Sequence, residues 1–520
     1  MKTFVRTILF CFIIISTLFS AQKSKIITTK SSAWKNPVEM FAYCNSNNVD
    51  LIVDKDFTLT SRVESSINIS GNGTIFINSD DAAAGIDFIR NKKFASIPLK
   101  TAMKIGKKYN LALKNVGIYI SSTDVLTDRM KNKPYLKNEF VVSDNKGNFV
   151  IPVVNDYSKS TTEIEYAPIS EQRIIRDVQF KIIGTGRLEN RIAFLRNYRD
   201  QLLIDNIIIT NHTGQQLQVG IENNENHNTT FKNSKIVGFN KIGSGYGVAN
   251  YSSANFSMEN MDISECIHAY TGRNTKNVTI LGGTFSDGID DHWTNNFVVE
   301  NVTINASAGS AGFQFSGSNI NIKNSKVLGN ARFYFAIRTD TPYLKGTVNI
   351  INPTFITNLK DDIYLFSFTS PYLVLENNFI GKISYPDNLN IVNPVIESSA
   401  EKNNIIFLPP INKEFFGIGK ITLNGVAKIA SKNDQAQLYA IVYVKQDDFQ
   451  INTTEIIANA FSVNTNISNS YLLYLDVLNS FNHLPKLYIE NNKGWQYMKI
   501  PKNYNFLVSF KNNSDLQLKQ

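Results

Sequence analysis

Lys276-Asn277-Val278-Thr279-Ile280 and Glu300-Asn301-Val302-Thr303-Ile304 are two copies of the pattern that decides the fold. In each copy an asparagine is followed by aliphatic residues at alternate positions, as in a short β-strand. The same pattern recurs along the chain, with the asparagine at Asn115, Asn206, Asn233, Asn260, Asn324, Asn352 and Asn377, and with Asp177 in its place once. Such self-similarity indicates a solenoid of stacked repeats.

The spacing of these asparagines predicts the type of solenoid. From Asn206 to Asn377 they are separated by 27, 27, 17, 24, 23, 28 and 25 residues. Repeats in the twenties, without amphipathic helices between them, predict one coil of a right-handed parallel β-helix per repeat. An asparagine tolerates the bend between strands, and its amide can bond to the asparagine of the next coil. The alternatives are a leucine-rich-repeat solenoid, whose leucines are missing here, and an array of β-sandwiches.

The N-terminal residues 1–21 have the layout of a secretory signal peptide. Lys2 and Arg6 precede an apolar run from Ile8 to Leu18, and small residues follow. This run is shorter than the roughly 20 residues that span a bilayer. We therefore expect a protein that is secreted, periplasmic or at the cell surface, without a transmembrane anchor.

The remaining chain is predicted to be all-β, in two parts. Residues 22–411 form the β-helix, with a hairpin insertion around residues 121–172. Residues 412–520 lack the asparagine repeat and are predicted to form a small accessory domain like a β-sandwich. A short amphipathic helix over residues 36–48 is followed by entry strands and a glycine-rich turn. This order resembles the N-terminal cap of the pectate-lyase-like β-helix superfamily, which includes polysaccharide lyases, polygalacturonases and tailspikes.

The charge of the chain suggests an anionic partner. Its formal net charge of +9 becomes +7 when Lys2 and Arg6 leave with the signal peptide. An exported basic protein suits an acidic polysaccharide, although solubility alone would also explain the charge. We expect no nucleic-acid partner, because the chain has no long Lys/Arg run. Cys44 and Cys266 are predicted to be buried free thiols.

Residues with catalytic potential concentrate between His268 and His292. His268 lies nine residues before Asn277, and His292 lies nine residues before Asn301. If both asparagines hold the same place in their coils, the two histidines lie on adjacent coils, roughly 4.8 Å apart. An inward ladder of Tyr251, His268, His292 and Phe315 is the structural interpretation of the same spacing.

The functional interpretation is an acid–base site, because clustered charges shift one another's pKa values. The predicted catalytic residues are Asp287, Asp290, Asp291, His268, His292 and Arg273. The predicted substrate-binding residues are Tyr251, Tyr270, Trp293, Gln314 and Arg338, with Tyr270 and Trp293 as flat platforms for sugar rings. No cofactor or metal is expected; calcium at the three aspartates would be possible, but their spacing matches no defined loop.

The site resembles those of the superfamily only in part. Asp290-Asp291-His292 is similar to the Asp-x-His of mannuronan epimerases and to the Asp-Asp of polygalacturonases, but their other signature residues have no clear counterpart. The favoured function is hydrolysis of glycosidic bonds in a polysaccharide by two of the three aspartates. The alternatives are a lyase or epimerase acting on uronic acids, and a non-catalytic glycan-binding or surface protein.

Overall fold

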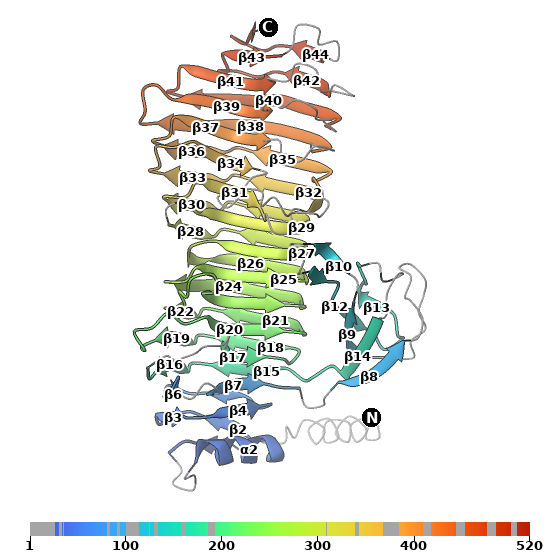
Figure 1. Ribbon diagram of the computed structural model, residues 1–520, viewed down its shortest axis with the longest axis vertical. Helices are drawn as coiled ribbons and strands as arrows, with labels where there is room; N and C mark the ends of the chain where they lie inside the picture. Colours follow the sequence, from blue (N-terminus) through green and yellow to red (C-terminus); the bar gives the residue numbers. More distant parts are fainter. Residues whose placement is uncertain are drawn as a thin grey trace, which may run out of the picture.

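A computed structural model describes residues 26–30, 34, 36–80, 84–90, 94–99, 114–123, 125–128, 134–155, 157, 162–185, 193–307, 309–338, 343–367, 384–408, 418–443, 453–475, 485–500 and 507–519. Their strands stack into one long column, a parallel β-helix (Figure 1). The predicted signal peptide and the repeat copy at Asn377 lie outside the described residues. Within these ranges no helix is long and apolar enough to cross a membrane.

Each coil contributes strands to up to three sheets that run along the column, and neighbouring coils pair in parallel. The first sheet contains β4 (Arg62–Ser65), β7 (Gly85–Phe88), β17 (Ala193–Asn197), β20 (Val219–Asn224), β23 (Tyr246–Tyr251), β25 (His268–Arg273), the start of β27 (Ile289–Glu300), the start of β29 (Ala311–Lys323), β31 (Phe333–Ile337), β34 (Ile363–Ser367), β37 (Lys402–Leu408), β39 (Gln437–Tyr443), β41 (Asn469–Leu475), β43 (Tyr497–Lys499) and β45 (Gln517–Lys519).

The second sheet contains β1 (Ile26–Thr28), β2 (Asp50–Ile52), β5 (Ile69–Ser70), β15 (Arg173–Arg176), β18 (Leu202–Asp205), β21 (His227–Lys232), the start of β24 (Ala254–Ser264) and of β26 (Thr275–Ser286), the ends of β27 and β29, β32 (Leu344–Ile351), β35 (Asn388–Val392), the start of β38 (Lys420–Ser431) and of β40 (Glu455–Thr465), β42 (Lys486–Glu490) and β44 (Leu507–Lys511). The third contains β3 (Phe57–Leu59), β6 (Thr74–Asn78), β16 (Gln179–Ile183), β19 (Ile208–Asn211), β22 (Lys235–Val237), the ends of β24 and β26, β28 (Thr303–Ala306), β30 (Lys326–Gly329), β33 (Thr354–Thr357), β36 (Val395–Ser398) and the ends of β38 and β40.

The column has one continuous apolar core, as the repeat predicts. It runs from Met40 to Ile500 and is built from the inward residues of all three sheets. At its N-terminal end lies the predicted helix, α2 (Pro37–Asn47), whose amide of Val38 donates to the side chain of Asn36. Its buried face, Met40, Phe41 and Cys44, joins the core.

The repeat asparagines mark a corner of the coil where the backbone turns through the left-handed region. We call this line of residues the corner ladder: Asp177, Asn206, Asn233, Asn260, Gly282, Asn301, Asn324, Asn352 and Asn393. Asn206 has φ 53° and Asn324 has φ 50°. The Nδ2 of Asn352 donates to Oδ1 of Asn324 at 2.8 Å, so the side chains bond from coil to coil. Asparagine suits this corner because it tolerates positive φ better than most residues.

Asn277 does not belong to the corner ladder, and the prediction that it does is wrong. The residue that follows Asn260 in the corner ladder is Gly282, because Glu259 pairs with Leu281. Asn277 instead lies in a second ladder at another corner, where it bonds to Asn255 at 2.9 Å and accepts from Asn296 at 3.1 Å. This explains the irregular spacing of 17 residues after Asn260.

Asn324→Ala should destabilise the protein, whereas Asn324→Gly should cost much less. Alanine at φ 50° would carry a strain of about 1–2 kcal/mol, and glycine carries none. Equilibrium unfolding in urea would measure both variants. An equal decrease in the free energy of unfolding for the two variants would mean that the amide bonds, and not the backbone conformation, explain the preference for asparagine at this position.

The C-terminal region is not a separate β-sandwich, and that prediction is wrong. From β38 to β45 every described strand pairs in parallel with the coil before it. The repeat is hard to see here because Gly425 and Ala460 occupy positive-φ positions where earlier coils have asparagine. The amide bonds return in the last coils, where Asn512 donates to Asn491 at 3.0 Å. The β-helix therefore continues through residue 519 (Figure 1).

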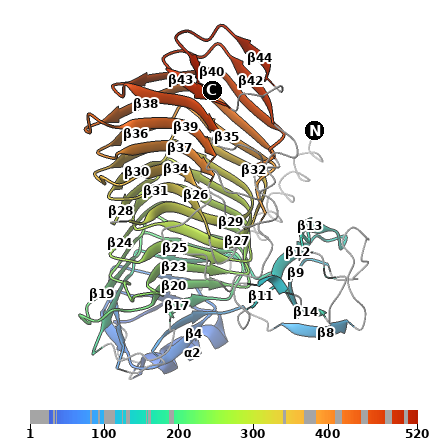
Figure 2. The ribbon, with the colours of Figure 1, turned by 45° about the horizontal axis from the view of Figure 1, so that its top comes forward.

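The insertion is larger than predicted and begins earlier. It is an antiparallel sheet of β8 (Ala95–Leu99), β9 (Val116–Ser122), β12 (Glu139–Ser143), β13 (Phe149–Ile151) and β14 (Thr162–Pro168), with the hairpin β10 (Val125–Asp128) and β11 (Pro134–Leu136). It projects from one side of the column (Figure 2). The repeat copy at Asn115 was therefore misread, since the strand after it, β9, belongs to the insertion.

A buried lysine joins the insertion to the column. Lys276 of β26 forms an ion pair with Glu139 of β12, and its Nζ donates to the carbonyl of Pro152 at 2.8 Å. Only 4% of the Lys276 side chain and 1% of that of Glu139 are exposed. Burial lowers the pKa of Lys276, while the charge of Glu139 opposes the change.

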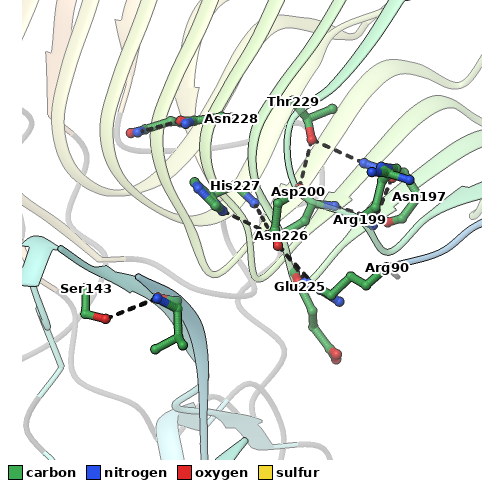
Figure 3. Close-up of polar contacts among 12 residues, drawn as sticks. Arg90, Ser143, Asn197, Arg199, Asp200, Glu225, Asn226, His227, Asn228 and Thr229 are labelled. Carbon is green, nitrogen blue, oxygen red and sulfur yellow. Dashed lines mark hydrogen bonds and ion pairs between the residues drawn. The ribbon is translucent and has the colours of Figure 1, made fainter. Parts of the chain in front are cut away.

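A second buried contact lies where the chain leaves the column for the insertion (Figure 3). Arg90, just after β7, lies 3.3 Å from the carboxylate of Asp200, which also lies 3.0 Å from Nδ1 of His227. The ring of Phe140, from the insertion, stacks on His227 at 5.8 Å. His227 is thus a buried residue at the contact between the insertion and the column.

Lys276→Met should weaken the docking of the insertion. It leaves the Glu139 carboxylate buried without its cation, which costs about 3–5 kcal/mol. Lys235→Met is the matched control, because the pair of Lys235 with Asp262 is 2.9 Å long but about half exposed, and such pairs contribute about 0–1 kcal/mol. Unfolding free energies would compare the two. Similar decreases in the free energy of unfolding of both variants would contradict the role of Lys276 as a buried anchor of the insertion.

Candidate functional site

Side chains from three successive coils meet on the outer face of the first sheet, and His268 lies on the coil before them. Asp290 and His292 lie on β27, Gln314 lies on β29, and Arg338 directly follows β31. Because neighbouring coils pair in register, side chains from these strands come within contact distance. We call Asp290, His292, Gln314, Arg338 and the nearby His268 of β25 the Asp290 cluster.

Asp290 is the centre of this cluster. Its Oδ2 lies 2.8 Å from Nη1 of Arg338 and 3.4 Å from Nε2 of His292. Nη1 of Arg338 also donates to Oε1 of Gln314 at 3.1 Å. The side chain of Asp290 is 1% exposed, and those of His292 and Arg338 are 15% and 14% exposed. The carboxylate is therefore buried beneath groups that reach the surface.

His268 lies within the electrostatic field of the same cluster. Burial lowers its pKa, the negative charges of Asp290 and Asp287 oppose this change, and the positive charges of Arg338 and His292 add to it. Its ring stacks on Tyr246 at 5.9 Å. Nδ1 of His268 and Oδ1 of Asp290 are both buried, and neither has a hydrogen-bond partner among the described residues. Such groups are costly in a fold and are candidates for contact with a ligand.

The predicted overlay of His268 and His292 is wrong. Tyr270 pairs with Ile289, so His268 is opposite Asp287 on the next coil and opposite Tyr246 on the coil before. The prediction failed because Asn277 and Asn301 belong to different ladders. The inward ladder of Tyr251, His268, His292 and Phe315 does not exist either, since Tyr251 pairs with Arg273 and Phe315 pairs with Asp291.

Asp291 faces the interior of the column, although its neighbour Asp290 faces outward. It accepts hydrogen bonds from the hydroxyl of Thr275 at 2.7 Å and from the amide of Trp293 at 3.0 Å, and the hydroxyl of Tyr270 lies 3.3 Å away. Tyr270 is itself fully buried in the core. The predictions of Asp291 as a catalytic acid and of Tyr270 as a sugar platform are therefore wrong, because a polysaccharide cannot reach either.

An internal ladder of polar groups explains why an aspartate is tolerated inside. Asn197 donates to Asn223 at 2.7 Å, Asn223 to Asn250 at 2.8 Å, and Asn250 to the hydroxyl of Tyr270 at 3.0 Å. Asp291 ends this row. Burial raises the pKa of its carboxyl well above the usual range, and the charge of Asp290 adds to the effect, while hydrogen bonds from Thr275 and Trp293 oppose it.

The remaining predicted residues lie around the cluster. Asp287, at the turn before β27, is half-buried and accepts from the amide of Ser307. The guanidinium of Arg273 lies 5.2 Å from the ring centre of Tyr251. Trp293 packs against Tyr343, a residue that the sequence pattern did not single out. Among the described residues no group of three or more His, Cys, Asp and Glu could hold a metal ion.

Sequence comparisons find no matching family model and no matching curated protein. Solved structures do match. The tailspike gp54 of Acinetobacter baumannii bacteriophage AP22, in complex with A. baumannii capsular saccharide, is 12% identical with a TM-score of 0.53, over 93% of this chain and 76% of that one. The tailspike gp49 of Pseudomonas phage LKA1 is 13% identical with a TM-score of 0.45, over 92% of this chain and 76% of that one. A hyperthermoactive exopolygalacturonase from Thermotoga maritima is 10% identical with a TM-score of 0.34, over 81% of this chain and 86% of that one. At this identity the AP22 match shows the fold alone, and it agrees with the parallel β-helix that the strand pairings describe.

Asp291→Asn should make the stability of the protein less dependent on pH. The folded-state pKa of Asp291 is raised, so its stabilising effect is complete below the unfolded-state pKa and is lost as pH rises through the folded pKa. The free energy of unfolding of the variant should therefore rise relative to that of the parent protein as pH increases above about 4. Urea unfolding at several pH values would measure this. A constant difference between the two proteins would contradict a protonated, buried Asp291.

Proposed function

We propose that this protein is exported and cleaves an acidic polysaccharide on the outer face of the first sheet, by β-elimination. The observation that carries the proposal is the contact of Asp290 with both Arg338 and His292 beside His268. The cluster offers imidazoles for proton transfer and cationic groups for a substrate carboxylate. The net charge of +9 becomes +7 without Lys2 and Arg6 of the predicted signal peptide, and it still suits an anionic polymer.

In this reaction His268 is the favoured base. Its lowered pKa keeps the imidazole neutral near pH 7, so that it can accept a proton. The base removes the proton at C5 of a uronic acid unit, a C4–C5 double bond forms, and the C4–O bond to the neighbouring sugar breaks. The leaving oxygen takes a proton, for which His292 is placed beside Asp290. The negative charge of the uronate carboxylate disfavours a carbanion at C5. Arg273 and Arg338 are the candidates that would neutralise this charge.

Hydrolysis is the second candidate, although it is less well supported than the sequence suggested. It requires two carboxyl groups on either side of the scissile bond. Asp291 lies in the core, which leaves Asp290 and Asp287 as the pair. Asp290 is engaged by Arg338, an arrangement that suits an acceptor or orienting group better than a proton donor. The charge of Asp287 acts on His268, so Asp287 lies close enough to the cluster to serve as the second carboxyl group beside Asp290.

Incubation with a panel of acidic and neutral polysaccharides should distinguish these functions. β-Elimination yields new reducing ends together with the ultraviolet absorbance of an unsaturated uronate, and hydrolysis yields reducing ends alone. We expect the absorbance with at least one acidic polymer. Reducing ends without absorbance would establish hydrolysis instead. Retention of a polymer on a native gel without new ends would make this a binding protein and end the enzyme proposal.

Loss of the base His268, or of the Asp290 carboxylate that orients His292 and Arg338, should lower turnover strongly without loss of the fold. His268→Gln and Asp290→Asn should each lower kcat by about 10²–10⁴-fold. Asp291→Asn is the matched control and should retain activity, because its carboxyl lies in the core. The acidic limb of the rate profile should lie below pH 6.5, the ordinary pKa of histidine, because the pKa of His268 is lowered. An acidic limb above 6.5 would exclude His268 as the base.

A further inference from the structure

A second group of side chains lies directly beside the Asp290 cluster. The rings of Trp293 and Tyr343 are 4.4 Å apart between centroids and inclined by 33°. Nζ of Lys345 lies 4.9 Å from the ring centre of Tyr343. Trp293 follows His292 in the chain, whereas Tyr343 and Lys345 come from the coil that contains β32. Trp293 and Tyr343 are partly exposed and Lys345 is exposed.

The backbone fixes the positions of these rings. The pairing of β27 with β29 shifts between Asp291 and Thr294, so that Trp293 lies on a bulge. Such bulges redirect a side chain and are frequent beside functional sites. The amide of Trp293 is held by Asp291 at 3.0 Å, and the amide of Gly317 donates to the carbonyl of Tyr343 at 2.6 Å. Gly317 has φ +125°, where a Cβ would lie 1.9 Å from the carbonyl oxygen of Thr294.

We propose that Trp293, Tyr343 and Lys345 form a subsite that binds an anionic sugar unit of the polysaccharide, next to the unit that reacts. This inference takes the acidic polymer from the proposed function, but it does not require cleavage. The indole offers a broad apolar surface to the apolar face of a sugar ring, and its N–H is a donor for a hydroxyl. The ammonium of Lys345 balances a sugar carboxylate. Together with Arg338, it makes the charge of this region complementary to a polyanion.

Two buried acceptors beside the subsite point to a ligand with hydroxyl groups. Oδ1 of Asp290 and Oδ1 of Asn274 are buried without hydrogen-bond partners in the described part of the chain. The two residues are 1% and 5% exposed. Asn274 lies one coil before Trp293, and its Nδ2 is 3.5 Å from the carbonyl of Leu136 in the insertion. Sugar hydroxyls are donors that would satisfy both oxygens.

The last coils contain a similar arrangement that serves as a control. Nζ of Lys519 lies 5.2 Å from the ring centre of Tyr471, and Tyr471 stacks on Tyr439 at 5.2 Å and 16°. Tyr439 and Tyr471 lie three and four coils beyond β31, the last strand of the Asp290 cluster, so Tyr471 is about 19 Å from it at roughly 4.8 Å per coil. The same Lys–Tyr chemistry is thus present on the same solenoid, away from the Asp290 cluster.

Binding should be measured in the Asp290→Asn background, so that cleavage does not interfere. Affinity electrophoresis in gels that contain polygalacturonate, alginate or dextran gives the dissociation constant for each polymer. Trp293→Ala and Tyr343→Ala should each weaken retention by an acidic polymer about tenfold. Tyr343→Phe should restore it, since the ring is kept. Lys345→Met should reduce the preference for the acidic polymer over dextran. Tyr471→Ala should have no effect.

The two proposals fail in different ways. If the native protein cleaves an acidic polymer but Trp293→Ala and Tyr343→Ala leave its KM unchanged, the subsite is excluded and the proposed function stands. If Asp290→Asn protein is retained through Trp293 but the native protein cleaves no polymer, the subsite stands and the enzyme proposal fails. Equal losses of retention in Tyr471→Ala and Tyr343→Ala would show that these rings contribute only to the stability of the fold. Lack of retention by both acidic polymers would overturn the subsite.

Discussion

Parallel pairing of each coil with the next is the interaction on which the rest of this structure depends. No strand of a single coil is stable alone, because its backbone groups are paired only by the coils on either side. The spacing of about 4.8 Å between coils then applies to every side chain in a column. It aligns the asparagines of the corner ladder for amide bonding, and it brings Asp290 and Arg338, two coils apart along the first sheet, to 2.8 Å.

Alternation along a strand assigns opposite roles to adjacent residues of the same type. Asp290 points outward, where Arg338 and His292 meet it, and Asp291 points inward, where Thr275 and the amide of Trp293 bind it. The inward carboxyl is tolerated because the polar ladder from Asn197 to Tyr270 supplies hydrogen-bonding partners inside the column. The outward carboxyl has one oxygen without a partner among the described residues, and that oxygen lies next to groups that reach the surface.

The sequence predicted the fold because the asparagine pattern reports a local requirement, positive φ at a corner. It predicted the neighbourhood of the site for a simpler reason: His268, Asp290, His292 and Trp293 are close in sequence. It could not predict the contacts between coils, since asparagines from two corners look alike and Asn277 was assigned to the wrong one. Glycine can replace asparagine at a corner, as at Gly282 and Gly425, which hid the true coil lengths and the C-terminal coils. Tyr343 and Lys345 lacked any local signal, because their importance comes from Trp293 on another coil.

Coil length connects the corner ladder to the position of the site. Along the ladder, Asn260, Gly282, Asn301 and Asn324 define coils of 22, 19 and 23 residues, whereas the coil from Asn352 to Asn393 has 41. Asp290 and His292 lie on the coil of 19 residues, the shortest of these four. In that coil β26 and β27 are 12 residues long and turn the corner without a loop, so nearly all of its residues belong to the sheets. Side chains carried by strands keep their distances better than side chains carried by loops, which favours a site of this kind. Other parts of the chain are longer: the insertion, which Lys276 anchors to the column, separates β7 from β15, and the coil from Asn352 to Asn393 has 41 residues. The variation in coil length that obscured the repeat in the sequence therefore places Asp290 and His292 on a coil that consists almost entirely of strands.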